Sequence, residues 1–236
     1  MRICSFLPSA TEIVYALGLH DQLYGVTFEC DYPADARHKP KIVRSLFEHI
    51  DPPLSSGEIS QIIGQRLQEG LGIYEVDLAV LQNAEPDLLL SQAICEVCAI
   101  SSRQVTECSL RLAKTPQILS LDPQYVGDVL NDIRRVAAAT GTEARGEEIV
   151  ADLQARITAV AERATQATTR PRVLHLEWAE PVMCGGHWVP EMIILMLCGY
   201  TAQRALEDVP ILAAKPGWDD LPAVRHNQIF AIDAGA

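Results

Sequence analysis

Thiols, one imidazole and several indoles stand out among the residues that could bind or transform a ligand. Cys95 and Cys98 form a C-x-x-C pair directly after an apolar run, and Cys184 and His187 bound the segment CGGH. Thiolate and imidazole are good ligands for zinc and for the metal of a bound chelate. A C-x-x-C pair at a helix start can instead act as a redox dithiol, because the helix dipole lowers a thiol pKa there.

Four interpretations of Cys95 and Cys98 stay open: a redox dithiol, a metal site shared with Cys184 or His187, the lining of a ligand pocket, and inert burial. The pair lies a little too far before Ser101, a predicted helix start, to suit the redox role. It also lacks the second close ligand pair of a structural zinc site, unless Cys184 and His187 come near it. His187 is either an axial ligand to a corrinoid or haem iron, or a residue that hydrogen-bonds within its own loop.

Other polar and aromatic residues gather in loops that follow predicted strands. Besides the cysteines, the residues expected to contact a ligand from these loops are Ser9, Glu29, Asp31, Tyr32, Gln92, Glu177, Trp178, His187, Trp188 and Trp218. Ligands of open α/β sheets bind beyond the carboxyl ends of the strands, where such loops converge. We therefore predict a small-molecule site with aromatic walls and a few polar groups.

No catalytic motif accompanies these residues. Glu29 and Asp31 are either paired acids, or one of them caps the turn before Pro33, and nothing nearby in sequence supplies a nucleophile or an orienting base. The chain has no glycine-rich phosphate loop, no G-x-S-x-G elbow and no H-E-x-x-H motif. We therefore predict a binding protein rather than an enzyme, with no cofactor required.

Composition narrows the partners and the compartment. The formal net charge of −12 disfavours nucleic acid and anionic membranes as partners. The longest apolar run, 192–198, is far shorter than the roughly 20 residues of a membrane span. Seven cysteines without a framework-like spacing indicate reduced thiols. We expect a cytoplasmic protein, or a periplasmic one if a leader has been removed.

Strands and helices alternate along the first half of the sequence. Strands are predicted at 2–7, 23–27, 41–44, 87–90 and 117–121. Capping-box spacing predicts helix starts at Ser9, Ser55 and Ser101, and Asp77 and Asp122 are further predicted caps. Because parallel strands need helical crossovers, this alternation predicts an α/β fold with mostly parallel sheets.

One predicted helix is unusually long. Apolar residues repeat every three or four positions between Glu143 and about Thr168. A helix of this length suits a bridge between two lobes, and a new strand is predicted at 172–176. The predicted parts are an N-terminal α/β lobe at 1–141, a connecting backbone helix at 142–169 and a C-terminal α/β lobe at 170–236.

Four segments together resemble the class III periplasmic-binding-protein family, the binders of cobalamin, haem and iron-siderophores. They are SFLPSATEIVYALGLHDQLYGVTFECDYP, EPDLLLSQ, the long helix after TGTEARGEEIVADLQARI, and WDDLPAVRHNQIFAID. CEVCA and EWAEPVMCGGHW resemble a leaderless, cobalamin-binding-like branch. The resemblance implies two α/β lobes joined by a rigid helix, with cobalamin, haem or another metal chelate held in the cleft between them. Its pocket positions fall on the ECDYP loop, on Ser91 and Gln92, and on the EWAEP to GGHW loop.

The sequence departs from the family pattern in two places. Permease-docking relatives carry a glutamate on each lobe, and this chain has Ala79 at the first position, so permease docking is not expected. A helix and the approach to a strand are missing between 193 and 194, so the C-terminal lobe is expected to be shortened. The competing hypothesis is a metal-binding or redox protein that uses Cys95, Cys98, Cys184 and His187.

Overall fold

The computed structural model describes residues 1–48, 50, 54–93, 99–168, 175–187, 202–225 and 229. Contacts between Cα atoms divide the chain into two compact units, here called unit 1 (residues 1–49 and 69–168) and unit 2 (residues 50–68 and 169–236). Mixed helices and strands in two units, with one long helix, confirm the predicted α/β fold class. Within the described residues, no helix combines the length and the hydropathy needed to cross a membrane.

The contact division differs from the predicted boundaries at two places. Helix α2 (Ser56–Gln68) groups with unit 2 although it lies early in the sequence. Helix α6 (Glu143–Thr165) groups with unit 1 rather than forming a separate connector. Sequence order alone does not reveal such groupings, because they depend on contacts between residues far apart in the chain.

Unit 1 is built around a six-stranded sheet. The strands lie in the order β4 (Tyr74–Val76), β3 (Lys41–Ser45), β2 (Leu23–Thr27), β1 (Ile3–Ser5), β5 (Leu88–Ser91) and β6 (Gln117–Ser120). All neighbours are parallel except β3 and β4. The chain builds the sheet outward from β1 to β4 and then continues on the other side of β1, so the strand order reverses between β1 and β5.

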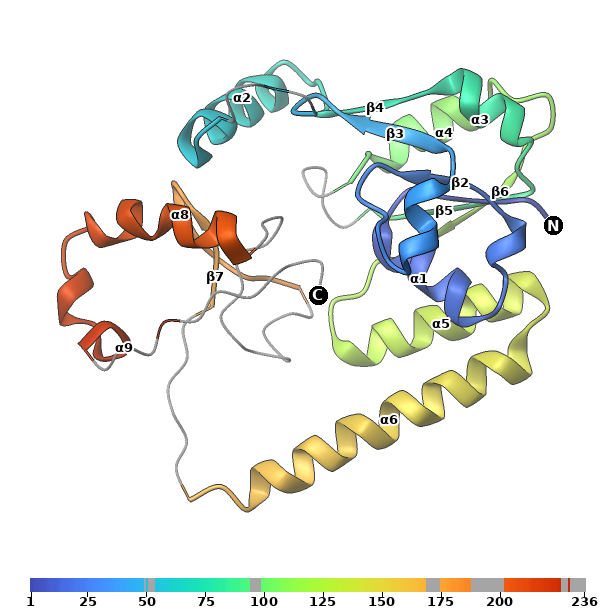
Figure 1. The fold of residues 1–236 in the computed structure, drawn as a ribbon. Coiled ribbons are helices and arrows are strands. Elements are labelled where there is room, and N and C mark those ends of the chain that lie inside the picture. Colours follow the sequence, from blue (N-terminus) through green and yellow to red (C-terminus); the bar gives the residue numbers. More distant parts are fainter. Residues whose placement is uncertain are drawn as a thin grey trace. The chain divides into compact units, whose positions relative to one another are not determined.

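Helices cover both faces of this sheet (Figure 1). They are α1 (Pro8–Ala16) and α5 (Val126–Thr140) on one face, and α3 (Leu78–Ala84) and α4 (Ser102–Ser109) on the other. Leu88 and Leu90 of β5 pack in the α1 and α5 cluster, whereas Leu89 packs in the α3 and α4 cluster. This alternation explains why Leu88, Leu89 and Leu90 are all apolar: both faces of the strand are buried, and only its last residue, Ser91, is polar.

Local capping signals predicted three helix starts correctly. Glu58 accepts hydrogen bonds from the backbone N and the Oγ of Ser55, at 2.8 and 2.7 Å, in front of α2. The Ser101 Oγ accepts the backbone N–H of Gln104 at the start of α4, and the Asp77 carboxylate accepts that of Val80 in α3. These bonds satisfy backbone donors that the first helical turn leaves unpaired.

Two other predicted helix starts are wrong. Helix α1 begins at Pro8 with Leu7 as its N-cap, so Ser9 lies inside the first turn and its side chain is no cap. Proline suits the first helical position because its φ is already helical and it has no N–H to leave unpaired. Helix α5 begins only at Val126, where the carboxylate of Asp128 accepts the backbone N–H of Tyr125 at 3.0 Å. Asp122 is therefore not its cap.

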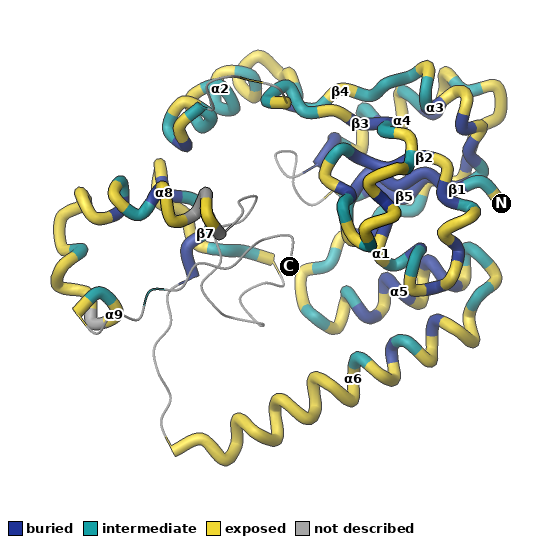
Figure 2. Tube along the Cα trace, viewed as in Figure 1, coloured by how far each residue is buried: buried dark blue, intermediate teal, exposed yellow. Residues whose placement is uncertain are grey.

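The long helix α6 packs against α5 through its first half only. A Cβ on Gly146 would lie 2.6 Å from the Cβ of Ala137, so the close approach of the two helices requires glycine there. Leu153 still packs on the α5 side, whereas Val160 is 55% exposed. Figure 2 shows the exposed second half of α6. The regular apolar spacing of α6 therefore continues into the second half of the helix, where the side chains are exposed.

Unit 2 has a small core of its own. Its described elements are α2, β7 (Leu176–Ala179), β8 (Val182–Cys184), α8 (Ala202–Ala213) and α9 (Pro222–Arg225). Leu176, Ala179 and Leu212 are buried, with Trp178 and Trp218 packed against them. The described strands pair antiparallel, not parallel as predicted, because a two-residue loop at 180–181 can join only antiparallel neighbours.

Candidate functional site

The carboxyl ends of β1, β2, β3, β5 and β6 lie at one edge of the unit 1 sheet, here called the carboxyl edge. The strand order reverses between β1 and β5, and ligands of open α/β sheets bind beyond such a switch point. Four chain segments leave the sheet near it: the start of α1 with Ser9, the loop with Glu29, Asp31 and Tyr32 after β2, the residues Ser91 and Gln92, and the loop with Asp122 after β6.

Ser91 presents an unused hydroxyl group at this edge. The residue is 1% exposed, and its Oγ has no hydrogen-bond partner within the described part of the chain. Buried hydroxyl groups are nearly always hydrogen-bonded in native proteins, because an unpaired one loses its solvation without compensation. A buried hydroxyl without a partner at a switch point is suited to a ligand or to an ordered water. Gln92, which follows it, is half-buried.

The carboxyl group of Glu29, at this edge, has a raised pKa. Desolvation by its surroundings raises the pKa of Glu29 to about 7, although the residue as a whole is exposed to solvent. Asp31 instead forms an ion pair with Arg37, at 3.3 Å between carboxylate and guanidinium. Burial, followed by the repulsion of Asp31, also raises the pKa of Glu12. The edge therefore carries carboxyl groups of which one titrates near neutrality.

Cys30 fixes the loop that carries Glu29 and Asp31. Its Sγ lies 3.1 Å from the Oγ1 of Thr11 and 3.2 Å from the Oγ1 of Thr27, and the residue is 1% exposed. The buried thiol thus anchors the middle of the loop to α1 and β2, whereas Tyr32 is 62% exposed. The sequence analysis missed this anchor; the signal was a cysteine between two acids directly after a buried strand.

Asp122, predicted as a helix cap, has a different role in the structure. Its Oδ1 accepts the backbone N–H of Ala93 at 2.5 Å, and its Oδ2 accepts the hydroxyl of Ser120 at 2.7 Å. It therefore links the chain leaving β5 to the end of β6. The available signal was the Ser120-x-Asp122 spacing at the end of a strand, where an aspartate commonly bonds nearby backbone and hydroxyl groups.

In unit 2, Trp178 is half-buried and its indole N–H is already engaged. The indole N–H donates to the Oγ of Ser60 at 2.7 Å and to the carbonyl of Glu180 at 2.9 Å. The Ser60 hydroxyl also donates to that carbonyl at 2.6 Å, which ties α2 to the β7–β8 turn. Any role of Trp178 toward a ligand would thus use its ring face. Trp218 lies in a short 3₁₀ turn, and Glu177 is half-buried on β7.

Cys184 and His187 lie at the far end of the β7–β8 hairpin, and both are exposed. His187 has a left-handed backbone, with φ of 55°. His175 is buried against Gly185, where a Cβ would lie 1.9 Å from its Nδ1, so Gly185 must lack a side chain. No group of three His, Cys, Asp or Glu side chains within the described residues could hold a metal ion. Cys95, Cys98 and Trp188 lie outside those residues, so their predicted roles stay predictions.

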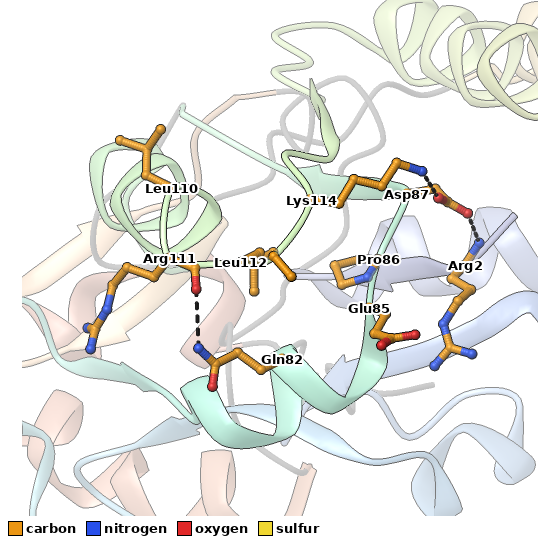
Figure 3. A pocket seen from close by; sticks show the side chains of 10 residues that line it. Arg2, Gln82, Glu85, Pro86, Asp87, Leu110, Arg111, Leu112 and Lys114 are labelled. Atoms are coloured by element: carbon orange, nitrogen blue, oxygen red, sulfur yellow. Dashed lines mark hydrogen bonds and ion pairs between the residues drawn. The ribbon is translucent and has the colours of Figure 1, made fainter.

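An open pocket of about 710 Å³ lies at the opposite edge of the unit 1 sheet, beside the amino ends of β1, β5 and β6 (Figure 3). Asp87 joins two of its residues, because it accepts the backbone N–H of Arg2 at 2.8 Å and the ammonium group of Lys114 at 2.6 Å. These bonds lower the pKa of Asp87. None of the predicted site residues lines this pocket.

Comparisons with known proteins agree with the fold. The family model described as "Periplasmic binding protein" matches residues 3–197. The chain is 24% identical to the uncharacterized ABC transporter substrate-binding lipoprotein YvrC of Bacillus subtilis strain 168, over 98% of this chain and 72% of that protein.

Two solved structures share the fold at low identity. The periplasmic haem-binding protein RhuT from Roseiflexus sp. RS-1 is 22% identical, with a TM-score of 0.65 over 98% of this chain and 89% of that one. The periplasmic vitamin B12 binding protein BtuF of Vibrio cholerae is 18% identical, with a TM-score of 0.65 over 99% and 88%. The match of the family model over most of the sequence decides the assignment: the chain belongs to the periplasmic binding protein family.

Proposed function

We propose that this protein is a solute-binding protein that takes up a cobalamin-like metal chelate at the carboxyl edge of unit 1. The observation that carries the proposal is the buried, unpartnered hydroxyl of Ser91 at the strand switch point, next to Gln92. Membership of the periplasmic binding protein family supports a binding role, and fold relatives are described as binders of haem and of vitamin B12.

The charges of the edge favour one kind of chelate over another. Haem carries carboxylate groups at its rim, whereas the rim of cobalamin carries amides, which donate and accept hydrogen bonds without a negative charge. Glu12, Glu29 and Asp31 lie on the segments next to the switch point, and the whole chain has a formal net charge of −12. Like charges brought together on binding cost free energy, so an amide-rich ligand fits this edge better.

Each proposed contact has a role that its chemistry allows. The Ser91 hydroxyl and the Gln92 amide would each pair with a ligand amide, and Glu29 in its ionised form would accept an N–H from the ligand. Most of the affinity would come from burying a large flat ligand, and the polar contacts would orient it. Trp178, Trp218, His187 and Glu177 of unit 2 stay predicted contacts.

Titration of the purified protein with aquacobalamin and with haemin tests the proposal. We expect saturable one-to-one binding of aquacobalamin, followed by its visible absorption and by calorimetry, and weaker binding of haemin. Gln92→Ala should weaken binding about fivefold, the value of one hydrogen bond. Gln154→Ala, on the exposed second half of α6, is the matched control and should bind as the wild type does. Failure to bind aquacobalamin, or tighter binding of haemin, would refute the proposal.

The compartment and the permease remain separate proposals. The seven cysteines favour a cytoplasmic protein, whereas the relative YvrC is described as a lipoprotein of an ABC transporter. Ala79 lies exposed on α3 at the position where the family resemblance predicts a permease-docking glutamate. Fractionation of cells that make the protein from its own gene decides the first question, and co-purification with a permease decides the second.

A further inference from the structure

We propose that Asp122 is a positioning residue of the carboxyl edge: it fixes the chain where it leaves β5 and keeps the hydroxyl of Ser91 available to a ligand. The inference rests on the function proposed above, because Ser91 and Gln92 are its proposed contacts. Asp122 would touch no ligand itself; it would act through these two residues.

The first argument is the geometry of the carboxylate. Oδ1 accepts the backbone N–H of Ala93, the residue after Gln92, and Oδ2 accepts the hydroxyl of Ser120, the last residue of β6. Two separate acceptor atoms are thus used by donors from two neighbouring strand ends. An asparagine at this position has one neutral acceptor oxygen, so its bond to Ala93 would be weaker, and the contact with Ser120 could persist only with the amide nitrogen as the donor.

The second argument concerns the partner of Ser91. Ser91 and Ser120 are paired in register on β5 and β6. Side chains of such a pair lie on the same face with Cβ atoms about 5 Å apart, which is close enough for two hydroxyl groups to bond. Ser120 instead donates to Asp122, and the Ser91 Oγ has no partner in the described part of the chain. The bond to Asp122 directs the Ser120 hydroxyl toward that carboxylate, and in this arrangement it does not pair with the Ser91 hydroxyl.

The third argument is that no other structural role claims Asp122. Helix α5 begins four residues later, and the carboxylate of Asp128 accepts the N–H groups of Gln124 and Tyr125 at its start, both at 3.0 Å. Among the residues that the structure describes, Asp122 forms no ion pair. Its hydrogen bonds therefore serve the loops of the carboxyl edge rather than the helix.

Hydrogen exchange and ligand release in Asp122→Asn test this inference. We expect the amide of Ala93, followed by NMR, to exchange about tenfold faster, and aquacobalamin to bind about fivefold more weakly through faster release. Asp122→Glu, which keeps two acceptor oxygens, should recover part of both losses. Asp152→Asn, an exposed aspartate on α6, is the matched control and should change neither.

The outcomes separate this inference from the proposed function. The inference is overturned if the amide of Ala93 exchanges at the same rate in Asp122→Asn as in the wild type. It is also overturned if exchange at Leu88 to Leu90 accelerates as much as at Ala93, because such a uniform change indicates a general loss of stability. If the wild type binds aquacobalamin and Asp122→Asn binds it equally tightly, the inference is overturned as well. If the wild type binds no aquacobalamin, the proposed function fails, whereas faster exchange confined to Ala93 still supports the positioning of the loop by Asp122.

Discussion

The two edges of the unit 1 sheet differ in whether their polar groups are already paired within the protein. At the amino ends of the strands, Asp87 is bonded by Arg2 and Lys114, and its pKa is lowered. At the carboxyl edge, the pKa of Glu29 is raised to about 7 and the buried hydroxyl of Ser91 has no partner among the described residues. The open pocket lies at the first edge and the unused chemistry at the second. Pocket volume alone would thus point to a different edge from the one that we propose for the ligand, because ligands need unsatisfied groups as well as space.

The largest effect on stability should come from the amino edge. Arg2→Ala removes hydrogen bonds to the carbonyls of Ala84 and Asn83 and the stacking of the guanidinium on Tyr24. We expect the free energy of unfolding in urea to fall by about 1–3 kcal/mol, with ligand affinity unchanged. Arg103→Ala, on the exposed face of α4, is the control. Loss of ligand affinity without loss of stability would contradict the proposal that the amino edge stabilises the fold and the carboxyl edge binds the ligand.

Glu29→Gln should change how stability depends on pH. The folded-state pKa of Glu29, about 7, exceeds its ordinary value of 4.5, so the protonated form is favoured on folding. The contribution of Glu29 to the free energy of unfolding is therefore fully present below pH 4.5 and is lost as the pH rises through 7. The wild type should lose about 1 kcal/mol over this window relative to Glu29→Gln, a value reduced because the side chain is partly exposed. Urea unfolding from pH 4 to 8 measures this, with Glu75→Gln on β4 as control.

Ser91→Ala separates binding from stability. Because the wild-type hydroxyl has no partner in the described part of the chain, its removal breaks no hydrogen bond, and the free energy of unfolding should stay constant or rise by up to about 1 kcal/mol. The affinity for aquacobalamin should fall about three- to tenfold. A clear loss of stability in urea would show that the hydroxyl is bonded within the protein.

The smallest effect is expected for Lys114→Met. Its ion pair with Asp87 is largely open to solvent, since the lysine side chain is 75% exposed. Such pairs contribute little, so the melting temperature should change by less than about 2 °C at physiological salt. A larger drop would mean that the amino edge depends on this pair rather than on Arg2.

Much of unit 1 could be predicted from the sequence because its signals are local. The apolar run before Ser91 identified a strand buried on both faces, and Ser55 and Ser101 marked helix starts by capping spacing. Three-residue strands such as β4 have too little sequence to show a period. Helix α2 groups with unit 2 through contacts between residues far apart in the chain, such as the bond between Ser60 and the Glu180 carbonyl, which no local pattern encodes.

The candidate site follows less directly from the sequence than the fold does. The residue types at Glu29, Ser91 and Gln92 directed attention to the carboxyl edge, and there the pKa of Glu29 and the unused Ser91 hydroxyl support the choice. Asp122 was read as a helix cap because Asp-Pro before an apolar period is a common helix start. Its actual partners, Ala93 and Ser120, are known only once two strands lie side by side.

Hydrogen exchange of the wild-type protein with and without aquacobalamin tests the central claim most directly. Our account predicts that ligand slows exchange at Ser91 to Ala93 and in the loop from Glu29 to Tyr32, and leaves Arg2 and Lys114 unchanged. Slower exchange at Arg2 and Lys114, with no change at Ser91, would contradict it.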